Sequence, residues 1–337
     1  MAEAEEVSRA TTGHQAHRRR LSRTGYCVWS RGSSAKNHAS PDFAISALSR
    51  YTQWDFLALV ERYGIAWHEK TLGQLFCDVS AKDIIAMLRG LMQKAGVDLQ
   101  LQSSASNLAK ADGHFTFDLQ TPDRTVKVTA RNLVIATGGK SIPKMGATGL
   151  AHDLARQFGL RLSEPRPGLV PMTFADQDLA LCRPLAGVSV EARIVHGDGA
   201  FRDALLFTHR GLSGPVILQI SSFWRPGETL QIDLAPDHDV AAALKSARGR
   251  AGRVEVATAL GRFLPERLAS AVAAEAGLTD ARLADQGNRV LDSVGARINR
   301  WQVRPVGTEG YRTAEVTLGG HRIEIGRDFV EDVSAQS

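Results

Sequence analysis

Residues 132–140 read Asn-Leu-Val-Ile-Ala-Thr-Gly-Gly-Lys, and this stretch decides which fold class the sequence indicates. The run 133–136 is apolar without a polar break, and so short a run predicts a strand buried on both faces of a parallel sheet. Gly138 and Gly139 lack a Cβ, so the main chain there can pass close to a ligand. Taken alone, such a turn is more often a simple passage from strand to loop. A dinucleotide-binding α/β domain also opens on a G-x-G-x-x-G turn, and no residues before 132 have that form.

Length and composition predict a soluble protein of two domains. The chain has 337 residues, of which 43% are hydrophobic and 23% charged, and it exceeds the size at which a single core usually stops growing. No apolar run approaches the roughly 20 residues of a membrane-spanning helix, so no membrane partner is expected. The cysteines Cys27, Cys77 and Cys182 lie far apart without a C-x-x-C pair. This pattern indicates free thiols in a reducing, cytoplasmic setting and no metal site.

The charge is concentrated at the amino end. The net charge is +5, and residues 1–38 contribute +4 because they hold seven Lys or Arg against three Glu. The residues after 38 carry a net charge of only about +1, which does not support a nucleic-acid-binding surface. No nucleic acid is therefore expected as a partner. Residues 1–40 show no apolar periodicity and predict an irregular basic segment. A nucleic-acid-binding protein that uses the arginines at 18–20 is kept as an alternative to a solvated tail.

Organised structure is expected from residue 41 onward. Apolar residues recur at helical spacing between Phe43 and Tyr63 and predict two helices with residues 51–54 between them. Ser80 with Asp83 three residues later predicts a capping box at the start of a third helix.

Three strands are expected to follow that helix. Alternating or β-branched residues predict strands at 97–101, 115–119 and 126–129, and a Pro122-Asp123 turn joins the last two. The buried run 133–136 comes next. Helix, strand, antiparallel hairpin and buried parallel strand, in that order, are typical of the second half of an FAD-binding domain.

Short motifs in a fixed order then give a resemblance to a known family. They are Arg50-Tyr51-Thr52, Trp54-Asp55-Phe56, the stretch 69–77, Ala136-Thr137-Gly138-Gly139, Phe207-Thr208-His209 with Gly211, Ser213-Gly214-Pro215, Gly307-Thr308-Glu309-Gly310 and the stretch 314–320. With these motifs the chain resembles the bacterial flavoproteins known as aminoacetone-oxidase-like or NAD(P)/FAD-dependent oxidoreductases.

The resemblance implies an α/β fold, in which an incomplete Rossmann-like FAD-binding domain carries an inserted small β-barrel domain and a helical insertion. The expected parts are an irregular basic segment at 1–40, the partial FAD-binding domain at 41–165, the barrel at 166–236 with 299–312, the helical insertion at 237–298, a return to the FAD domain at 313–320 and a tail unlike the family at 321–337. The residue patterns agree, since they predict short strands at 188–195, 204–208 and 230–234 and helical periodicity over 238–298.

The resemblance also implies function. The family is expected to pass a hydride between flavin and a small organic substrate or NAD(P)H, so FAD is the expected cofactor and NAD(P)H a second one. The implied cofactor-binding residues are Thr137, Gly138, Gly139, Ala105, Thr317, Gly319 and Gly320. No catalytic residue is assigned. His209 is either a general acid or base or, as is more common in a glycine-rich loop, a structural hydrogen-bonding group.

Both ends of the chain depart from the family pattern. Residues 31–37 stand where a Ser-Gly-Gly-Gly-Arg-Cys-Asn type stretch is expected, and residues 321–325 stand where a second cofactor-binding segment is expected. Charge-assisted hydrogen bonds to the flavin phosphates come from such segments. An alternative is therefore a truncated or frame-shifted, non-catalytic remnant that no longer binds FAD. No oligomeric state is predicted.

Overall fold

A computed structural model describes residues 49–69 and 75–321. The predicted basic segment at 1–40, the helix expected from Phe43 and the tail beyond residue 321 lie outside the described residues. The chain divides into two units, each described by itself: Met1–Thr137 with Leu150–Ser163 and His321–Ser337, and Gly138–Gly149 with Glu164–Gly320. In the described part, no helix is long and apolar enough to cross a membrane.

The first unit consists of short helices and small antiparallel sheets. Its elements are α3 (Gln53–Arg62), β1 (Trp67–Glu69), β2 (Leu75–Cys77), α4 (Lys82–Lys94), β3 (Ser104–Ala111), β4 (His114–Gln120), β5 (Thr125–Ala130) and α5 (Leu150–Gln157). β1 pairs with β2, and β3, β4 and β5 form a three-stranded sheet in that order. The predicted hairpin across Pro122-Asp123 is therefore confirmed.

The capping box lies at a different helix from the one predicted. Thr52 Oγ1 accepts a hydrogen bond from the Asp55 N–H at 3.4 Å, and the Thr52 N–H donates to Asp55 Oδ2 at 2.6 Å, so the box starts α3. Hydrogen bonding from Thr52 lowers the pKa of Asp55. At α4 the Ser80 side chain accepts from the Lys82 N–H at 3.1 Å, but the described contacts include no bond between Ser80 and the Asp83 side chain, so the predicted capping box is wrong.

The strand predicted at 97–101 is also wrong, because the pairing strand is β3 further along the chain. Asp112 and Gly113 both have positive φ, of 53° and 75°. This two-residue turn aligns β3 with β4, from Ser104 opposite Gln120 to Ala111 opposite His114. The alternating residues at 97–101 have no strand partner among the described residues and stay outside the sheet.

The buried strand predicted at 133–136 does not form in the described structure. Val134 is 84% exposed and Ile135 41% exposed. A parallel strand takes its hydrogen bonds from neighbouring strands, and the described residues place none beside 132–137. The apolar run 133–136 is therefore an extended, exposed segment. The described residues form no parallel Rossmann-like sheet.

The second unit is built on a seven-stranded antiparallel sheet with the order β12-β11-β8-β9-β10-β7-β13. Its strands are β7 (Met172–Thr173), β8 (Ser189–His196), β9 (Gly199–Thr208), β10 (Gly211–Ser213), β11 (Leu230–Asp233), β12 (Trp301–Val303) and β13 (Gly307–Thr308). Helices α6 (Asp176–Cys182) and α7 (Pro215–Ser221) pack on the sheet. The strands predicted at 188–195, 204–208 and 230–234 and the helix predicted from Pro215 are confirmed. A separate two-stranded sheet pairs β14 (Val316–His321) with β6 (Leu162–Gly168).

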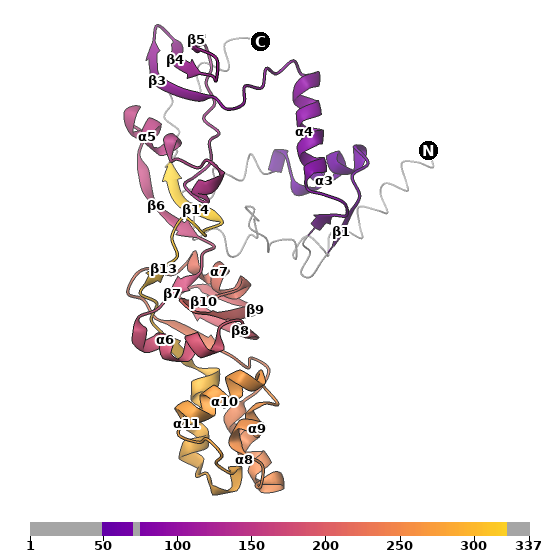
Figure 1. Ribbon diagram of the computed structural model, residues 1–337, viewed down its shortest axis with the longest axis vertical. Coiled ribbons are helices and arrows are strands. Elements are labelled where there is room, and N and C mark those ends of the chain that lie inside the picture. Colours follow the sequence, from indigo (N-terminus) through magenta and orange to yellow (C-terminus); the bar gives the residue numbers. More distant parts are fainter. Residues whose placement is uncertain (1–48, 70–74, 322–337) are drawn as a thin grey trace. The chain divides into compact units, whose positions relative to one another are not determined.

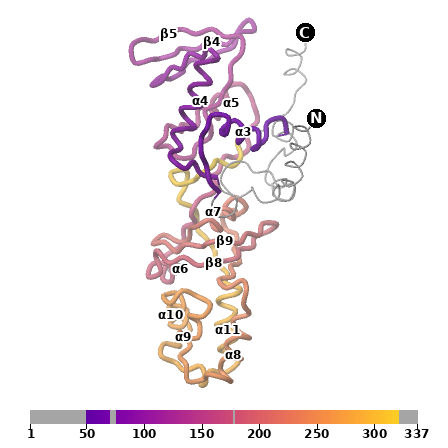
Figure 2. Tube along the Cα trace, turned by 90° about the vertical axis from the view of Figure 1, so that its right-hand side faces the viewer, coloured from indigo at the N-terminus to yellow at the C-terminus, as the bar shows by residue number. Residues whose placement is uncertain are grey.

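Four helices occupy the stretch predicted to be helical. They are α8 (Val240–Ala251), α9 (Val256–Leu260), α10 (Glu266–Glu275) and α11 (Asn288–Asn299), and they gather into one group that we call the helical unit (Figure 1, Figure 2). α8 and α11 approach closely because Gly295 has no side chain, and a Cβ there would lie 2.6 Å from that of Ala241.

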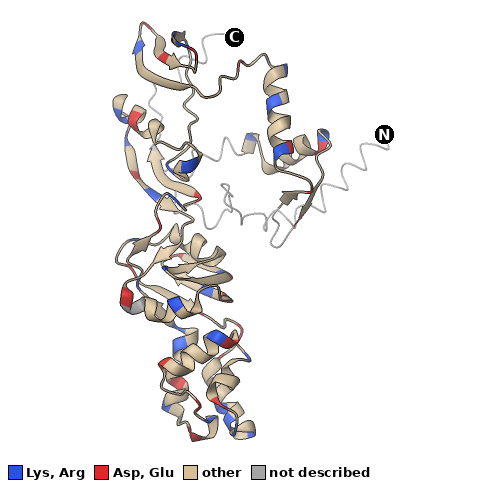
Figure 3. Ribbon diagram, viewed as in Figure 1, with Lys and Arg blue, Asp and Glu red and all other residues tan. Residues whose placement is uncertain are grey.

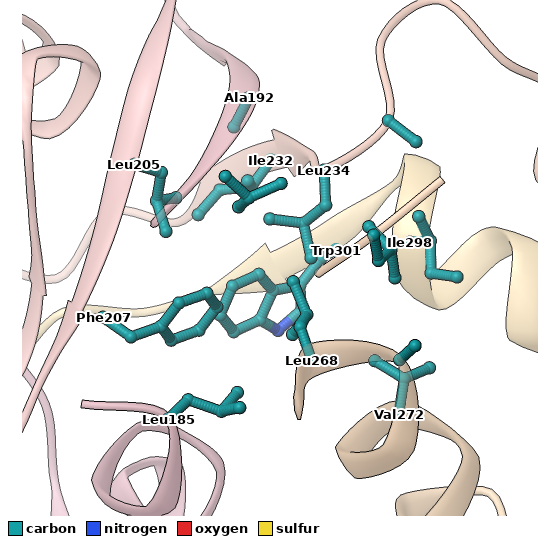
Figure 4. Close-up of a cluster of buried hydrophobic side chains, with 14 of the residues drawn as sticks. Leu185, Ala192, Leu205, Phe207, Ile232, Leu234, Leu268, Val272, Ile298 and Trp301 are labelled. Atoms are coloured by element: carbon teal, nitrogen blue, oxygen red, sulfur yellow. The ribbon is translucent and has the colours of Figure 1, made fainter. Parts of the chain in front are cut away.

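One hydrophobic core joins the sheet to the helical unit. Val190, Ala192 and Ile194 alternate along β8 and point inward, as expected for a strand with one buried face. Phe207 stacks on Trp301 with ring centroids 6.2 Å apart, and Figure 4 shows this pair beside side chains from α10 and α11. Because one core spans both parts, the helices are positioned rigidly on the sheet.

Asn299 ties the end of the helical unit back to the sheet. Its Oδ1 accepts from the Val240 N–H at 3.0 Å. Its Nδ2 donates to Asp233 Oδ1 at 2.9 Å and contacts the carbonyls of Ala235 (3.2 Å) and His238 (2.9 Å). One amide side chain thus holds the segment between β11 and α8.

Candidate functional site

The predicted glycine turn lies against strand β14. The two segments, residues 138–142 and 317–320, form a cluster that we call the glycine junction. The Lys140 N–H donates to Thr317 Oγ1 at 2.8 Å, and Ser141 Oγ shares a hydrogen bond with the same oxygen at 3.0 Å. A single threonine hydroxyl therefore fixes the path of the chain just after the turn.

Glycine is required on both sides of the junction. A Cβ on Gly139 would lie 2.5 Å from the Cβ of Thr317, closer than real Cβ contacts allow. Gly138, Gly319 and Gly320 have φ of 70°, 77° and 107°, a region that residues with side chains rarely adopt. The result is bare main chain on two neighbouring segments, which can approach a flat ligand closely.

The bare main chain of the junction leaves room for a flat cofactor group. A Cβ on Gly138 would meet no atom within 4 Å, so the turn is bordered by open space. The side chain of Lys140 runs along Gly149, where an added Cβ would lie 2.9 Å from Lys140 Cε. The segments expected to bind the flavin phosphates, at 31–37 and 321–325, lie outside the described residues except for His321, which ends β14.

Tyr311 lies beside the junction through its main chain. Its carbonyl accepts a hydrogen bond from the Ile142 N–H at 2.9 Å. Its hydroxyl is buried and, among the described residues, has no hydrogen-bond partner. An unsatisfied buried hydroxyl costs about 1–3 kcal/mol. Burial raises the pKa of Tyr311, Glu164 raises it further, and Arg166 opposes both.

The other predicted site residues lie elsewhere. Ala105 and Thr137 belong to the first unit, where Ala105 pairs with Leu119 of β4 and both predicted residues are exposed. Their cofactor contacts stay predictions. His209 is exposed at the turn between β9 and β10, and in the described part its ring makes no hydrogen bond. Neither reading of His209 gains support from the structure.

A cleft of about 980 Å³ lies between α6, β12 and the helices α10 and α11. Arg297 stacks over the Trp301 ring, 4.5 Å from its centroid, and pairs with Glu275 at 3.0 Å. Both contacts hold α11 against β12 and α10, whereas Arg297 Nη1 is buried and has no hydrogen-bond partner among the described residues.

The helical unit carries basic and acidic side chains together (Figure 3), with an excess of basic ones in its sequence. Residues 240–300 hold ten Lys or Arg against six Asp or Glu, a net charge of +4. Arg248 donates to the Gln286 carbonyl at 2.6 Å and to Asn288 Oδ1 at 2.8 Å, which joins the end of α8 to the start of α11. We call the arginines around this point the basic end: Arg248, Arg250, Arg253, Arg282 and Arg289. The last four are exposed and form no ion pair among the described residues.

The sheet and the helical unit define a recognised class of protein. Residues 166–316 match the family model described as HI0933-like protein barrel and H2TH domain. A curated relative from Escherichia coli, named ribosomal RNA dihydrouridine synthase, is 45% identical over 282 residues, which cover 83% of this chain and 70% of the relative. A relative of the same name from Haemophilus influenzae is 40% identical over 284 residues, with the same coverage. The chain therefore belongs to the same family as these two relatives, and residues 166–316 of it form an HI0933-like barrel and H2TH domain.

The predicted resemblance is confirmed at the level of a flavin-associated oxidoreductase family with a barrel and a helical domain. The relatives reported above are not named aminoacetone oxidases. The prediction of a small-molecule substrate and no nucleic acid is contradicted, because both relatives are named for a reaction on ribosomal RNA.

That prediction failed because the charge was averaged over too long a stretch. Beyond residue 38 the net charge is only about +1, but residues 240–300 carry +4 and the remainder carries −3. Electrostatic attraction to a phosphate backbone depends on local charge, since at physiological salt it is screened beyond about 8 Å. A neutral average therefore does not exclude an RNA surface.

Proposed function

We propose that this chain is a flavin-dependent enzyme that reduces uridine to dihydrouridine in ribosomal RNA, in the cytoplasm. The observation that carries the proposal is 45% identity to a protein of that name over 70% of that protein's length. The glycine junction supports it, because its bare main chain fits a flavin. The basic end supports it independently, because it offers cations to an RNA backbone.

The proposed chemistry adds two electrons and two hydrogens across the C5–C6 double bond of uracil. A bound FAD would supply the hydride, with NAD(P)H as its source of electrons. We propose that residues 41–165 and 313–320 belong to a Rossmann-like FAD domain and that Gly138, Gly139, Thr317, Gly319 and Gly320 border the flavin, with Thr137 and Ala105 as further contacts. Thr317 has the role of fixing the turn at Lys140 and Ser141.

The purified full chain is expected to convert uridine in unmodified ribosomal RNA when it is given FAD and NAD(P)H. Mass spectrometry of the digested nucleosides measures dihydrouridine, and absorbance near roughly 450 nm measures bound flavin. Bound flavin without dihydrouridine would reject the RNA substrate. Absence of both would instead favour the non-catalytic alternative.

The basic end is expected to bind RNA phosphates. Replacement of Arg250 and Arg253 with Glu should weaken RNA binding uniformly across sequences, because phosphate contacts do not read bases. The slope of log affinity against log salt should fall by about 1 for each arginine that contacts a phosphate. Filter binding or anisotropy at several salt concentrations measures both.

A matched control reverses two exposed charges outside the helical unit, Lys127 and Arg131. It changes the net charge equally, so it reports the general electrostatic effect. If both double variants lose affinity and slope to the same degree, the basic end is not the RNA surface.

A further inference from the structure

The cleft between α6, β12, α10 and α11 lies within the second unit and has a volume of about 980 Å³. Sites for small ligand groups occupy about 300–1,000 Å³ in proteins, so the cleft is large enough for one. Phe174, Leu181 and Pro184 contribute apolar surface to it, while Ala271 and Ala274 of α10 add only methyl groups. This lining suits a flat, largely apolar group.

Two arginines line the same cleft, and they differ in their partners. Arg297 lies over the Trp301 ring and pairs with Glu275, the one acid in the described lining. Arg300 is exposed and forms no ion pair among the described residues. Since the acid is already neutralised by Arg297, the cleft keeps one uncompensated positive charge at Arg300. A ligand that carries an anionic group beside its flat group fits this arrangement.

Helix α11 connects the cleft to the basic end. Ser293, Ala296, Arg297 and Arg300 line the cleft, and Arg289 belongs to the basic end. Positions 289, 293, 296, 297 and 300 follow the i, i+4, i+7, i+8 and i+11 spacing that places residues on one helix face. Arg289 and Ser293 are exposed along this face. Eleven residues of helix rise about 17 Å, so one extended ligand with several anionic groups can contact both ends.

We propose that this cleft binds an unpaired base of the ribosomal RNA, with Arg300 on the phosphate of that nucleotide and the basic end on phosphates further along the strand. This inference rests on the proposed function, because that function supplies RNA as the ligand. A ribonucleotide combines a flat base with an anionic phosphate, the two groups that the lining suits.

The cleft would select single-stranded RNA. Proteins that recognise RNA by sequence take unpaired bases onto aromatic rings or arginine guanidinium planes. A duplex keeps its bases stacked inside the helix, so it can reach the phosphate-binding arginines but cannot fill the cleft. The cleft therefore has a role in choosing the substrate, and no chemical step is assigned to it.

The decisive variant is Ala274→Trp in the full chain, which puts an indole into the cleft from an exposed position on α10. Fluorescence anisotropy measures binding to a short uridine-containing single strand and to a duplex of the same sequence. Affinity for the single strand should fall about tenfold or more, as expected for the loss of one stacked base. Affinity for the duplex should stay at the wild-type value. The control Ala242→Trp, at an exposed position of α8 outside the cleft lining, should bind both RNAs as the wild type does.

Arg300→Gln tests the phosphate contact separately. The slope of log affinity against log salt for the single strand should fall by about 1. Arg262→Gln removes an exposed charge from the same helical unit outside the cleft lining, and its slope should stay at the wild-type value. A single strand that carries 4-thiouridine should also cross-link, on illumination, to the peptide that contains Arg300 and Trp301. This readout needs no variant, so it decides the question even if Ala274→Trp does not fold.

The other outcomes overturn the assignment. Wild-type binding of the single strand by Ala274→Trp would show that no base enters the cleft, and equal losses for single strand and duplex would show a general disturbance of the RNA surface. Binding of free uridine monophosphate that Ala274→Trp abolishes, with RNA affinity unchanged, would assign the cleft to a free nucleotide instead. If the wild-type chain forms dihydrouridine and the cleft variants change nothing, the cleft assignment fails alone. If the wild-type chain binds no RNA, the RNA substrate of the proposed function fails with it.

Discussion

Alanine at position 139 is expected to weaken flavin binding by about tenfold or more. The added Cβ would lie 2.5 Å from the Cβ of Thr317, so either the turn or strand β14 has to move. Overpacking of this kind costs about 1–3 kcal/mol, and each 1.4 kcal/mol is a factor of ten in affinity. The displaced turn also loses the hydrogen bond from Lys140 to Thr317. Equilibrium dialysis with FAD measures the effect.

The control for Gly139→Ala is Gly90→Ala. Gly90 lies in helix α4, and a Cβ there would meet no atom within 4 Å. Alanine is the better helix former, so this variant should be at least as stable as the wild type and bind flavin equally. Adding Thr317→Gly to Gly139→Ala removes the clashing side chain and should restore part of the affinity. Wild-type flavin binding by Gly139→Ala would show that the junction does not shape the site.

Asn299→Asp is expected to destabilise the second unit by about 2–4 kcal/mol. The amide nitrogen of Asn299 donates to the carboxylate of Asp233 and contacts the Ala235 and His238 carbonyls. A carboxylate oxygen in its place faces only acceptors, so hydrogen bonds are replaced by repulsion. Urea unfolding followed by circular dichroism measures the change in the free energy of unfolding.

The loss in Asn299→Asp should depend on pH. The introduced carboxylate faces Asp233 and carbonyl oxygens, which disfavour its charged form and raise its pKa in the folded state. A raised carboxyl pKa destabilises the fold at neutral pH, and the loss should shrink as the pH falls and the group takes up a proton.

Asn288→Asp, at the other end of α11, is the matched control. The Asn288 oxygen accepts from Arg248 at 2.8 Å, and a carboxylate accepts this hydrogen bond equally well. This variant should keep wild-type stability. Equal losses in both variants would mean that the amide nitrogen of Asn299 is not what matters.

Patterns with a local cause were predicted correctly. The strands at 188–195 and 204–208 are confirmed because they pair with each other as one long hairpin, β8 with β9. Pro215 marks the start of α7, as its fixed φ and missing N–H predict. In these elements the deciding contacts lie nearby in the chain.

Patterns that need a distant partner were predicted wrongly. The run 133–136 has the composition of a buried strand, but no strand among the described residues pairs with it. Residues 97–101 alternate as a strand should, yet the Asp112-Gly113 turn selected the next segment as the partner of β4. Periodicity reports which face of a segment is apolar, not which segment covers it.

In the candidate site, too, local motifs were predicted and contacts between distant residues were not. Glycines 138 and 139 and Thr317 were singled out by motif, but their contact could not be read from their spacing. Tyr311 and Asn299 were missed because each acts through residues far along the chain. The sequence did contain one signal for Tyr311, since it directly follows the family motif that ends at Gly310.

The insertion of the helical unit has a kinetic consequence. β11 ends at Asp233 and β12 begins at Trp301, yet these strands are neighbours, with Ile232 opposite Trp301. If the segment between β11 and β12 were unfolded, bringing its ends together would cost conformational entropy before the two strands could pair. In the folded chain the Leu234 N–H bonds the Ile298 carbonyl at 2.9 Å, so the ends of the insertion lie side by side. Helices of the helical unit that form early through local contacts would bring β11 and β12 together. We expect the folding rate of these helices to set the rate at which β11 pairs with β12.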